Sequence, residues 1–62
     1  MELKVGLMYS SKWFAGLCTI LSIDKPKNEL IVRIDRESGS HEENWNLQHT
    51  IWGFENADYK KA

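Results

Sequence analysis

The 62-residue sequence lacks most of the features that stabilise small proteins. It has a single cysteine, Cys18, so no disulfide can form within the chain. Cysteine and histidine residues do not occur in pairs at the short spacing of structural zinc sites, and we expect neither a metal nor another cofactor. A chain of this length buries only about 60% of its extended surface, so a lone monomer should be marginally stable.

An excess of charge of either sign is also absent, because eight lysines and arginines face nine aspartates and glutamates, for a net charge of −1. Binding to nucleic acid is therefore unexpected, since it relies on excess positive charge. No run of 18 apolar residues is present, so no membrane span is expected. Glu2 and Lys4 interrupt the first nine residues, which therefore lack the apolar core of a signal peptide. The expected location is the cytoplasm.

Motifs for catalysis are missing as well. The four glycines are scattered and form no phosphate-binding loop. Glu42 and Glu43 are adjacent and would face opposite sides of a strand, so they form a poor pair of catalytic carboxylates. Ser10 and Ser11 lack the flanking glycines of a nucleophile elbow. We therefore expect a binding protein and no enzyme, with an active site at a pore between subunits as the enzymatic alternative.

What the chain does contain is β-strand patterning over most of its length. Strands are predicted over 3–9, 13–23, 30–36, 41–47 and 51–55, with a polar loop over 10–12 and a single 3₁₀ turn over 48–50. Gly16 predicts a bulge or bend in the second strand, and Pro26 and Asn28 mark the clearest turn. No stretch of ten or more residues has the apolar period of an amphipathic helix. The pattern predicts an all-β domain over 1–57, followed by a charged tail over 58–62 that should fray.

The layout resembles the SH3-like and Tudor-like small β-barrels. It has a first strand, a short polar loop, Trp13, a long bent strand, a tight hairpin, a glycine-containing turn and then Trp45-Asn46-Leu47. The resemblance covers most of the chain and implies a five-stranded antiparallel barrel. Those families bind methylated side chains in an aromatic cage or proline-rich peptides in a groove. The loop over 10–12 is not the acidic loop of peptide-binding SH3 domains, so we transfer the fold and not the ligand. An open meander that closes by dimerising is the structural alternative.

Aromatic residues are the main indication of function, with three tryptophans, two tyrosines and two phenylalanines in so short a chain. Trp13 and Phe14 are neighbours and should face opposite sides of a strand, as should Ile51 and Trp52. One or two large rings are therefore expected outside the core, where they can stack on a base, on a cation or on another subunit. For any single ring, packing in the core or at an interface is the favoured interpretation.

The alternation over 41–47 places His41, Glu43, Trp45 and Leu47 on one face. Polar side chains with hydrogen-bonding groups surround Trp45 over 41–49. The predicted ligand-binding residues are Tyr9, Lys12, Trp13, Arg33, His41, Glu43, Trp45, Asn46, His49 and Trp52. A tryptophan would stack on a planar ring, the two basic residues would meet phosphate, and the histidines, Glu43 and Asn46 would contact sugar and base. An ordinary solvated strand and loop explains the same polar residues.

These residues favour a non-catalytic binding protein that sequesters a small nucleotide-derived ligand. In size and aromatic content the chain is similar to the small phage-encoded sponge proteins that trap immune nucleotide signals. The alternative is a Tudor-like or SH3-like interaction module that binds a peptide or partner protein, and a nucleic-acid-associated barrel is a third possibility that the charge disfavours.

We also expect a homo-oligomer. Apolar residues occur on both faces of the second and third predicted strands; in the second, Cys18 and Ile20 share one face, and Leu17, Leu21 and Ile23 share the other. Only one face can line a core, so the other requires cover.

Overall fold

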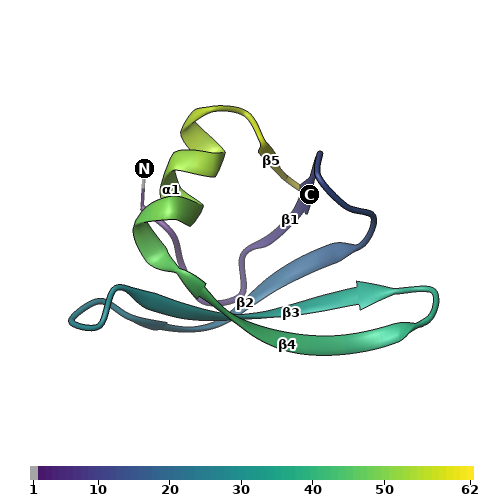
Figure 1. Ribbon diagram of the computed structural model, residues 1–62, viewed down its shortest axis with the longest axis horizontal. Coiled ribbons are helices and arrows are strands. Elements are labelled where there is room, and N and C mark those ends of the chain that lie inside the picture. Colours follow the sequence, from purple (N-terminus) through teal and green to yellow (C-terminus); the bar gives the residue numbers. More distant parts are fainter. Residues whose placement is uncertain (1) are drawn as a thin grey trace.

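The computed structural model describes residues 2–62 and shows a five-stranded antiparallel sheet with one short helix (Figure 1). The elements are β1 (Met8–Ser11), β2 (Leu17–Asp24), β3 (Glu29–Arg36), β4 (Gly39–Asn46), α1 (Leu47–Glu55) and β5 (Tyr59–Lys61). The strand order is β4-β3-β2-β1-β5, so β4 and β5 form the two edges of the sheet. The prediction of a five-stranded antiparallel β fold is confirmed, with the addition of the helix.

The sheet is strongly bent and encloses a small core. In Figure 1, β1 and β5 lie above β3 and β4, and α1 lies beside them over the other end of the sheet. The buried apolar residues are Leu3, Tyr9, Cys18, Ile20, Leu30, Val32 and Ile34. We call the side of the sheet that carries them the concave face and the opposite side the outer face. Within the described residues, the helix is too short to cross a membrane.

The hairpin between β2 and β3 forms as predicted. Asn28 adopts a left-handed conformation (φ 56°), and its backbone N–H donates to the carbonyl of Lys25 at 3.0 Å. A bulge between Ile20 and Ser22 shifts the register of β2, so that Ile23 pairs with the core residue Leu30. The alternation in the sequence had grouped Ile23 with Leu17 and Leu21, and this grouping is wrong because the bulge inserts one residue.

The outer face of β2 and β3 is partly apolar, as the sequence predicted. Leu17, Leu21 and Ile31 are half-buried there and do not belong to the core cluster. Ile31 pairs with Ser22 on one side and with Asn44 on the other, which places it opposite the buried residues of its own strand.

The strand predicted over 3–9 is shorter and later in the chain than expected. Leu3 is buried without belonging to a strand, and Gly6 turns the backbone with φ 91° while its N–H donates to the carbonyl of Ile20 at 2.8 Å. Strand pairing begins only at Met8 and continues through Ser11. Ser10 and Ser11, which were expected to form a loop, therefore belong to β1. The alternation was misleading because a turn, and not a strand, carries Leu3 into the core.

The second strand also starts later than predicted, at Leu17, because residues 13–16 form bends. Gly16 has φ 127°, and a Cβ at this position would lie 3.0 Å from the backbone oxygen of Asp35. Only glycine fits where this loop approaches β3 so closely, so Gly16 marks the bend and not the bulge.

The largest error of the sequence prediction concerns 47–55. The 3₁₀ turn over 48–50 and the strand over 51–55 are in fact the single helix α1. The Asn46 side chain accepts the His49 N–H at 2.9 Å, and the Asn28 side chain accepts the Gln48 N–H at 3.0 Å. These two caps satisfy first-turn N–H groups, and they stabilise a helix in a sequence whose Ile and Trp favour a strand.

The last residues contain a strand where a fraying tail was expected. Tyr59 pairs with Ser11 and Lys61 with Tyr9, and the Ala62 N–H donates to the carbonyl of Met8 at 2.9 Å. The Tyr59 ring lies so close to Gly53 of α1 that a Cβ there would be 2.6 Å from its Cδ2 atom. The tail prediction fails because Tyr59 packs into the domain and orders the residues around it.

Candidate functional site

The concave face continues beyond the core onto the edge strand β4. Alternate residues of β4 pair with core residues of β3: His41 with Ile34, Glu43 with Val32 and Trp45 with Leu30. Paired residues on adjacent strands share a face, so these three side chains lie on the core side of the sheet. His41 and Glu43 are nevertheless exposed, because no described element covers this part of β4. The sequence prediction that these three share one face is confirmed, whereas Leu47, which was grouped with them, begins α1.

Glu43 joins the three residues into one hydrogen-bonded unit, which we call the β4 triad. Its carboxylate accepts the Trp45 Nε1–H at 2.9 Å, and its other oxygen lies 2.7 Å from His41 Nε2. The hydrogen bond from Trp45 and then that from His41 hold the pKa of Glu43 below its ordinary value of 4.5. A charged acceptor is therefore fixed on an open part of the surface.

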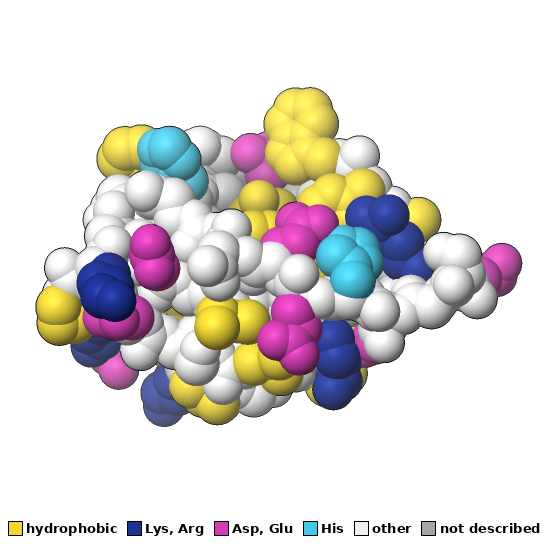
Figure 2. Space-filling model, turned by 60° about the horizontal axis from the view of Figure 1, so that its bottom comes forward, with side chains coloured by type: hydrophobic (Ala, Val, Ile, Leu, Met, Phe, Trp, Pro, Cys, Tyr) yellow, Lys and Arg dark blue, Asp and Glu magenta, His cyan; other side chains and the backbone are white. Residues whose placement is uncertain are grey.

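Three aromatic rings pack against Trp45 of the triad, and one cation lies nearby. The Trp45 ring stacks on Tyr59 at 5.7 Å and makes edge contacts with Phe14 at 6.0 Å and with the buried Tyr9 at 6.2 Å. The Arg36 guanidinium lies 5.4 Å from the Phe14 ring centre, within the range of a cation–π contact. Figure 2 shows this region, where a histidine and an acidic side chain lie next to hydrophobic surface and a basic side chain.

An open hollow adjoins this group on the side of Arg36. It has a volume of about 710 Å³ and is lined by Ala15, Gly16, Asp35, Arg36, Glu37 and Ser38. Ligand-binding pockets are typically hollows of this size, bordered by a few polar groups. The triad and the hollow together form the candidate site.

Tyr9, a predicted binding residue, belongs to the core instead. Its ring is fully buried and packs against Phe54 at 4.9 Å and Tyr59 at 5.4 Å. Burial raises the pKa of the Tyr9 phenol well above its ordinary value, with smaller contributions from Cys18 and Tyr59. The Tyr9 hydroxyl has no hydrogen-bond partner within residues 2–62. A ligand at the surface does not reach this ring.

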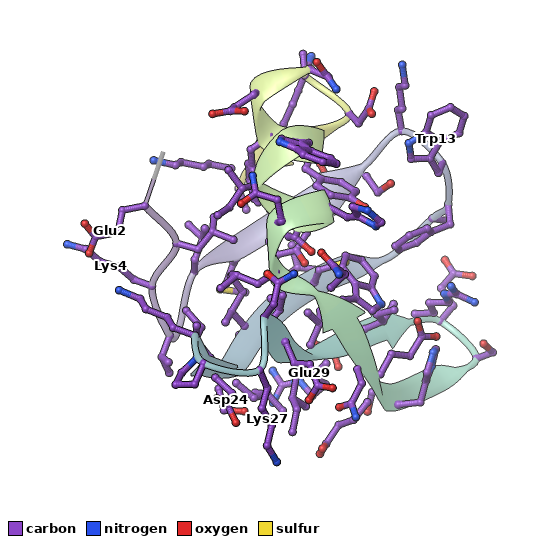
Figure 3. The ribbon with its side chains drawn as sticks, turned by 60° about the vertical axis from the view of Figure 1, so that its left-hand side comes forward. Glu2, Lys4, Trp13, Asp24, Lys27 and Glu29 are labelled. Atoms are coloured by element: carbon purple, nitrogen blue, oxygen red, sulfur yellow. The ribbon has the colours of Figure 1, made fainter. Side chains whose placement is uncertain are left out.

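Lys12 and Trp13 lie together in a second place. The Lys12 ammonium is 2.9 Å from an Asp58 carboxylate oxygen and 4.9 Å from the Trp13 ring centre. The Trp13 side chain is 68% exposed and projects from the loop between β1 and β2, away from the strands (Figure 3). The structure shows no contact between this pair and the β4 triad.

Arg33 lies on the outer face, where it pairs with Thr19 and Glu42, and its Nε is 3.2 Å from an Asp35 oxygen. It therefore faces away from the triad. The cation beside the triad is Arg36, which the sequence prediction missed. The alternation of Leu30, Val32 and Ile34 could have found it, because it continues to residue 36 on the same face. No such pattern indicated that Phe14 and Tyr59 would border the site.

The remaining predicted residues belong to the helix. Asn46 is its N-cap, and its side chain is engaged by His49 N–H and the Asn28 amide. The His49 ring stacks on Trp52 at 5.3 Å on the exposed side of α1, and Trp52 is 49% exposed. The ten predicted residues are thus divided among the triad, the Lys12–Trp13 pair, the outside of the helix, the outer face and the core.

No known protein family, curated protein or solved structure matches the chain. Within residues 2–62, no cluster of three or more histidine, cysteine, aspartate or glutamate side chains is suited to holding a metal ion.

Proposed function

We propose that the chain is a non-catalytic binding protein that sequesters a small, nucleotide-derived ligand at the β4 triad. The observation that supports this most is the fixed, charged Glu43 between His41 and the aromatic ring of Trp45. The half-buried Trp45 ring offers its solvent-facing part to a planar base, and the Glu43 carboxylate accepts sugar hydroxyls or base N–H groups. Arg36 supplies a charge for phosphate at the border of the adjoining hollow.

Sequestration suits these groups, because it requires affinity and rigidity but no proton transfer. The role would be that of the phage-encoded sponge proteins, which remove an immune nucleotide signal stoichiometrically. We place the protein in the cytoplasm, that of the host if a phage encodes it.

The finer fold assignment is a proposal too: a partly open barrel of the SH3-like or Tudor-like type. It is supported by the strong bend of the sheet and by α1, which contacts β3, β4 and β5 and so lies across the gap between the two edges (Figure 1). We further propose that copies of the chain associate, since the outer face carries the half-buried Leu17, Leu21 and Ile31.

A thermal-shift screen of nucleotides with matched glutamate variants tests the function. A ligand at 100 times its Kd adds about 2.7 kcal/mol to the free energy of unfolding, which raises Tm by roughly 10 °C or more in a domain of this size. Glu43→Gln should lower the affinity for the nucleotide that the screen identifies about tenfold or more, since a hydrogen bond to a charged group contributes about 1.5–3 kcal/mol. Glu42→Gln changes the neighbouring residue on the outer face and should leave the shift intact. If no nucleotide raises Tm, or both variants behave alike, the proposal fails.

Two exposed tryptophans favour a second candidate, the interaction module. Trp13 and Trp52 lie outside the triad, and large exposed rings are typical anchors at protein interfaces. Under this alternative a peptide or protein partner binds stoichiometrically. Its binding is lost in Trp13→Ala or Trp52→Ala and retained in Glu43→Gln, which is the reverse of the pattern expected for a nucleotide.

A further inference from the structure

The two edges of the sheet carry opposite charge. On the β4 edge, Glu42 and Glu43 are exposed, and on the β5 edge, Lys60 and Lys61 are exposed. Within residues 2–62, Glu42 and the two lysines have no ion-pair partner. An acidic edge strand and a basic edge strand therefore form the two ends of one sheet, and α1 contacts part of each.

Both edges also leave backbone groups unpaired. β4 is eight residues long, pairs with β3 without any irregularity and contains no proline or lysine, two common means of protecting an edge. β5 pairs only with β1. A strand edge of this kind is a template for strand addition, in which main-chain hydrogen bonds supply the contact.

The charges match on each face of the sheet separately. Glu43 lies on the concave face, and so does Lys61, because it pairs with the buried Tyr9. Glu42 lies on the outer face, and so does Lys60, one residue from Lys61 along the strand. If the two edges join into a continuous sheet, a lysine meets a glutamate on both faces, directly or on the diagonal within reach of long side chains.

We propose that β4 of one copy pairs with β5 of a second copy, so that the sheet continues from subunit to subunit. This inference rests on the proposed self-association and names its surface. Because the contact joins two different edges, it is head-to-tail and produces a closed ring or an open filament. In either case every interface is the same.

The pairing also adds a residue to the candidate site. Lys61 of the second copy would lie on the concave face beside Glu43, where Arg36 and the His41 ring are the nearby basic groups of the described residues. A ligand with more than one phosphate would then be held by two subunits, and ligand binding and assembly would reinforce each other.

A charge-swap experiment on the outer face tests the interface without changing the triad. The mass of the purified full chain is measured by sedimentation equilibrium over a range of concentrations. Glu42→Lys and Lys60→Glu should each raise the subunit dissociation constant about tenfold, since reversing a charge turns attraction into repulsion. The double variant, with the two charges exchanged, should recover most of the loss. Association of the original chain should weaken between about 0.05 and 0.5 M NaCl, where screening becomes strong.

Two further variants distinguish the alternatives. Lys25→Glu changes a lysine in the turn between β2 and β3 that lies beside Leu3 and Leu47 and on neither edge strand, and it should have no effect on association. Ile31→Lys places a charge on the apolar outer face. If it abolishes association while the edge variants do not, the copies meet through their faces and the edge proposal is overturned. A monomer at all concentrations overturns it too.

The failure of this proposal is distinguishable from failure of the proposed function. Lys60→Glu leaves His41, Glu43 and Trp45 unchanged, so the nucleotide screen can be repeated on a chain whose association is weakened. In the original chain, nucleotide binding without self-association refutes the edge pairing alone, whereas self-association without nucleotide binding refutes the ligand alone.

Discussion

Two ionisable residues of the concave face have opposite surroundings, and their pKa values shift in opposite directions for that reason. The Tyr9 phenol is fully buried without a hydrogen-bond partner in the described chain, and burial favours its neutral form. The Glu43 carboxylate is exposed and accepts two hydrogen bonds, which favour its charged form. Tyr9 therefore affects the stability of the core, whereas Glu43 supplies a charged group at the surface.

Replacing Tyr9 by phenylalanine should stabilise the protein. The buried hydroxyl has lost its water without gaining a partner, which typically costs about 1–3 kcal/mol. We expect Tyr9→Phe to raise the free energy of urea unfolding at pH 7 by about 1 kcal/mol. Tyr59→Phe is the control, because the Tyr59 hydroxyl is not an unpartnered buried group. A marked loss of stability in Tyr9→Phe would show that the hydroxyl has a partner after all.

The same residue predicts the response to alkali. Folding raises the pKa of Tyr9 above 10.0, so its contribution to stability is complete below pH 10 and decreases as the pH rises further. Tyr9→Phe should therefore lose less stability than the original chain above pH 10. Burial also raises the pKa of Cys18 to about 11 and that of Tyr59, so part of the loss remains in the variant.

Glu43 should titrate below its ordinary pKa because of its bonded neighbours. Its lowered pKa stabilises the fold above pH 4.5, and this contribution is lost as the pH falls through the folded-state pKa. Carbon-detected NMR should give a titration midpoint below 4.5 for the Glu43 carboxyl. Trp45→Phe removes the largest cause and should move the midpoint back toward 4.5. An unchanged midpoint in that variant would show that the indole N–H does not hold the carboxylate.

At the scale of secondary-structure elements, prediction from the sequence was reliable where a pattern is local. The β2–β3 hairpin follows from Asn28 and from the alternation of residues in β3. The alternation in β4 correctly placed His41, Glu43 and Trp45 on one face. Helix α1 was missed, since its caps include Asn28, which is far from it in sequence. Strand β5 was missed because a short, charged segment forms a strand only when it can pair with β1.

The candidate site, too, could be predicted only where a local pattern reports it. Arg33 was assigned to it as a phosphate contact because it is basic, yet strand alternation places it on the outer face. Trp13 and Lys12 were assigned to it as well, although the loop carries them elsewhere. Phe14 and Tyr59 contact Trp45 only because the sheet bends and β5 pairs with β1. No local sequence pattern indicates either feature.

The N-cap of α1 allows a direct test of how the helix is held. Asn46→Ala removes the acceptor of the His49 N–H and should lower the free energy of unfolding by about 1 kcal/mol. Asn44→Ala is a matched control on the same exposed strand, because no side-chain hydrogen bond of Asn44 corresponds to this cap. Urea unfolding followed by circular dichroism gives both values. Equal effects in the two variants would mean that Asn46 is not the residue that starts the helix.

For the molecule as a whole, size and assembly are connected. Few side chains are fully buried. Residues near both ends of the chain, Leu3 and Tyr59, contribute to the core. So small a core gives a protein of this length only a narrow margin of stability. A ligand or a second copy that binds the folded state should therefore greatly lower the fraction of unfolded protein.

If the edges of the sheet join as proposed, thermal stability must depend on protein concentration. Each subunit contributes one interface, so a tenfold increase in concentration adds up to about 1.4 kcal/mol per subunit once association is appreciable. That amount corresponds to a rise in Tm of about 5 °C or more for a domain of this length. Calorimetry across a hundredfold range of concentration should show this rise for the original chain and a much smaller one for Lys60→Glu. A Tm that is independent of concentration in both would mean that the folded subunit derives its stability from its own core alone.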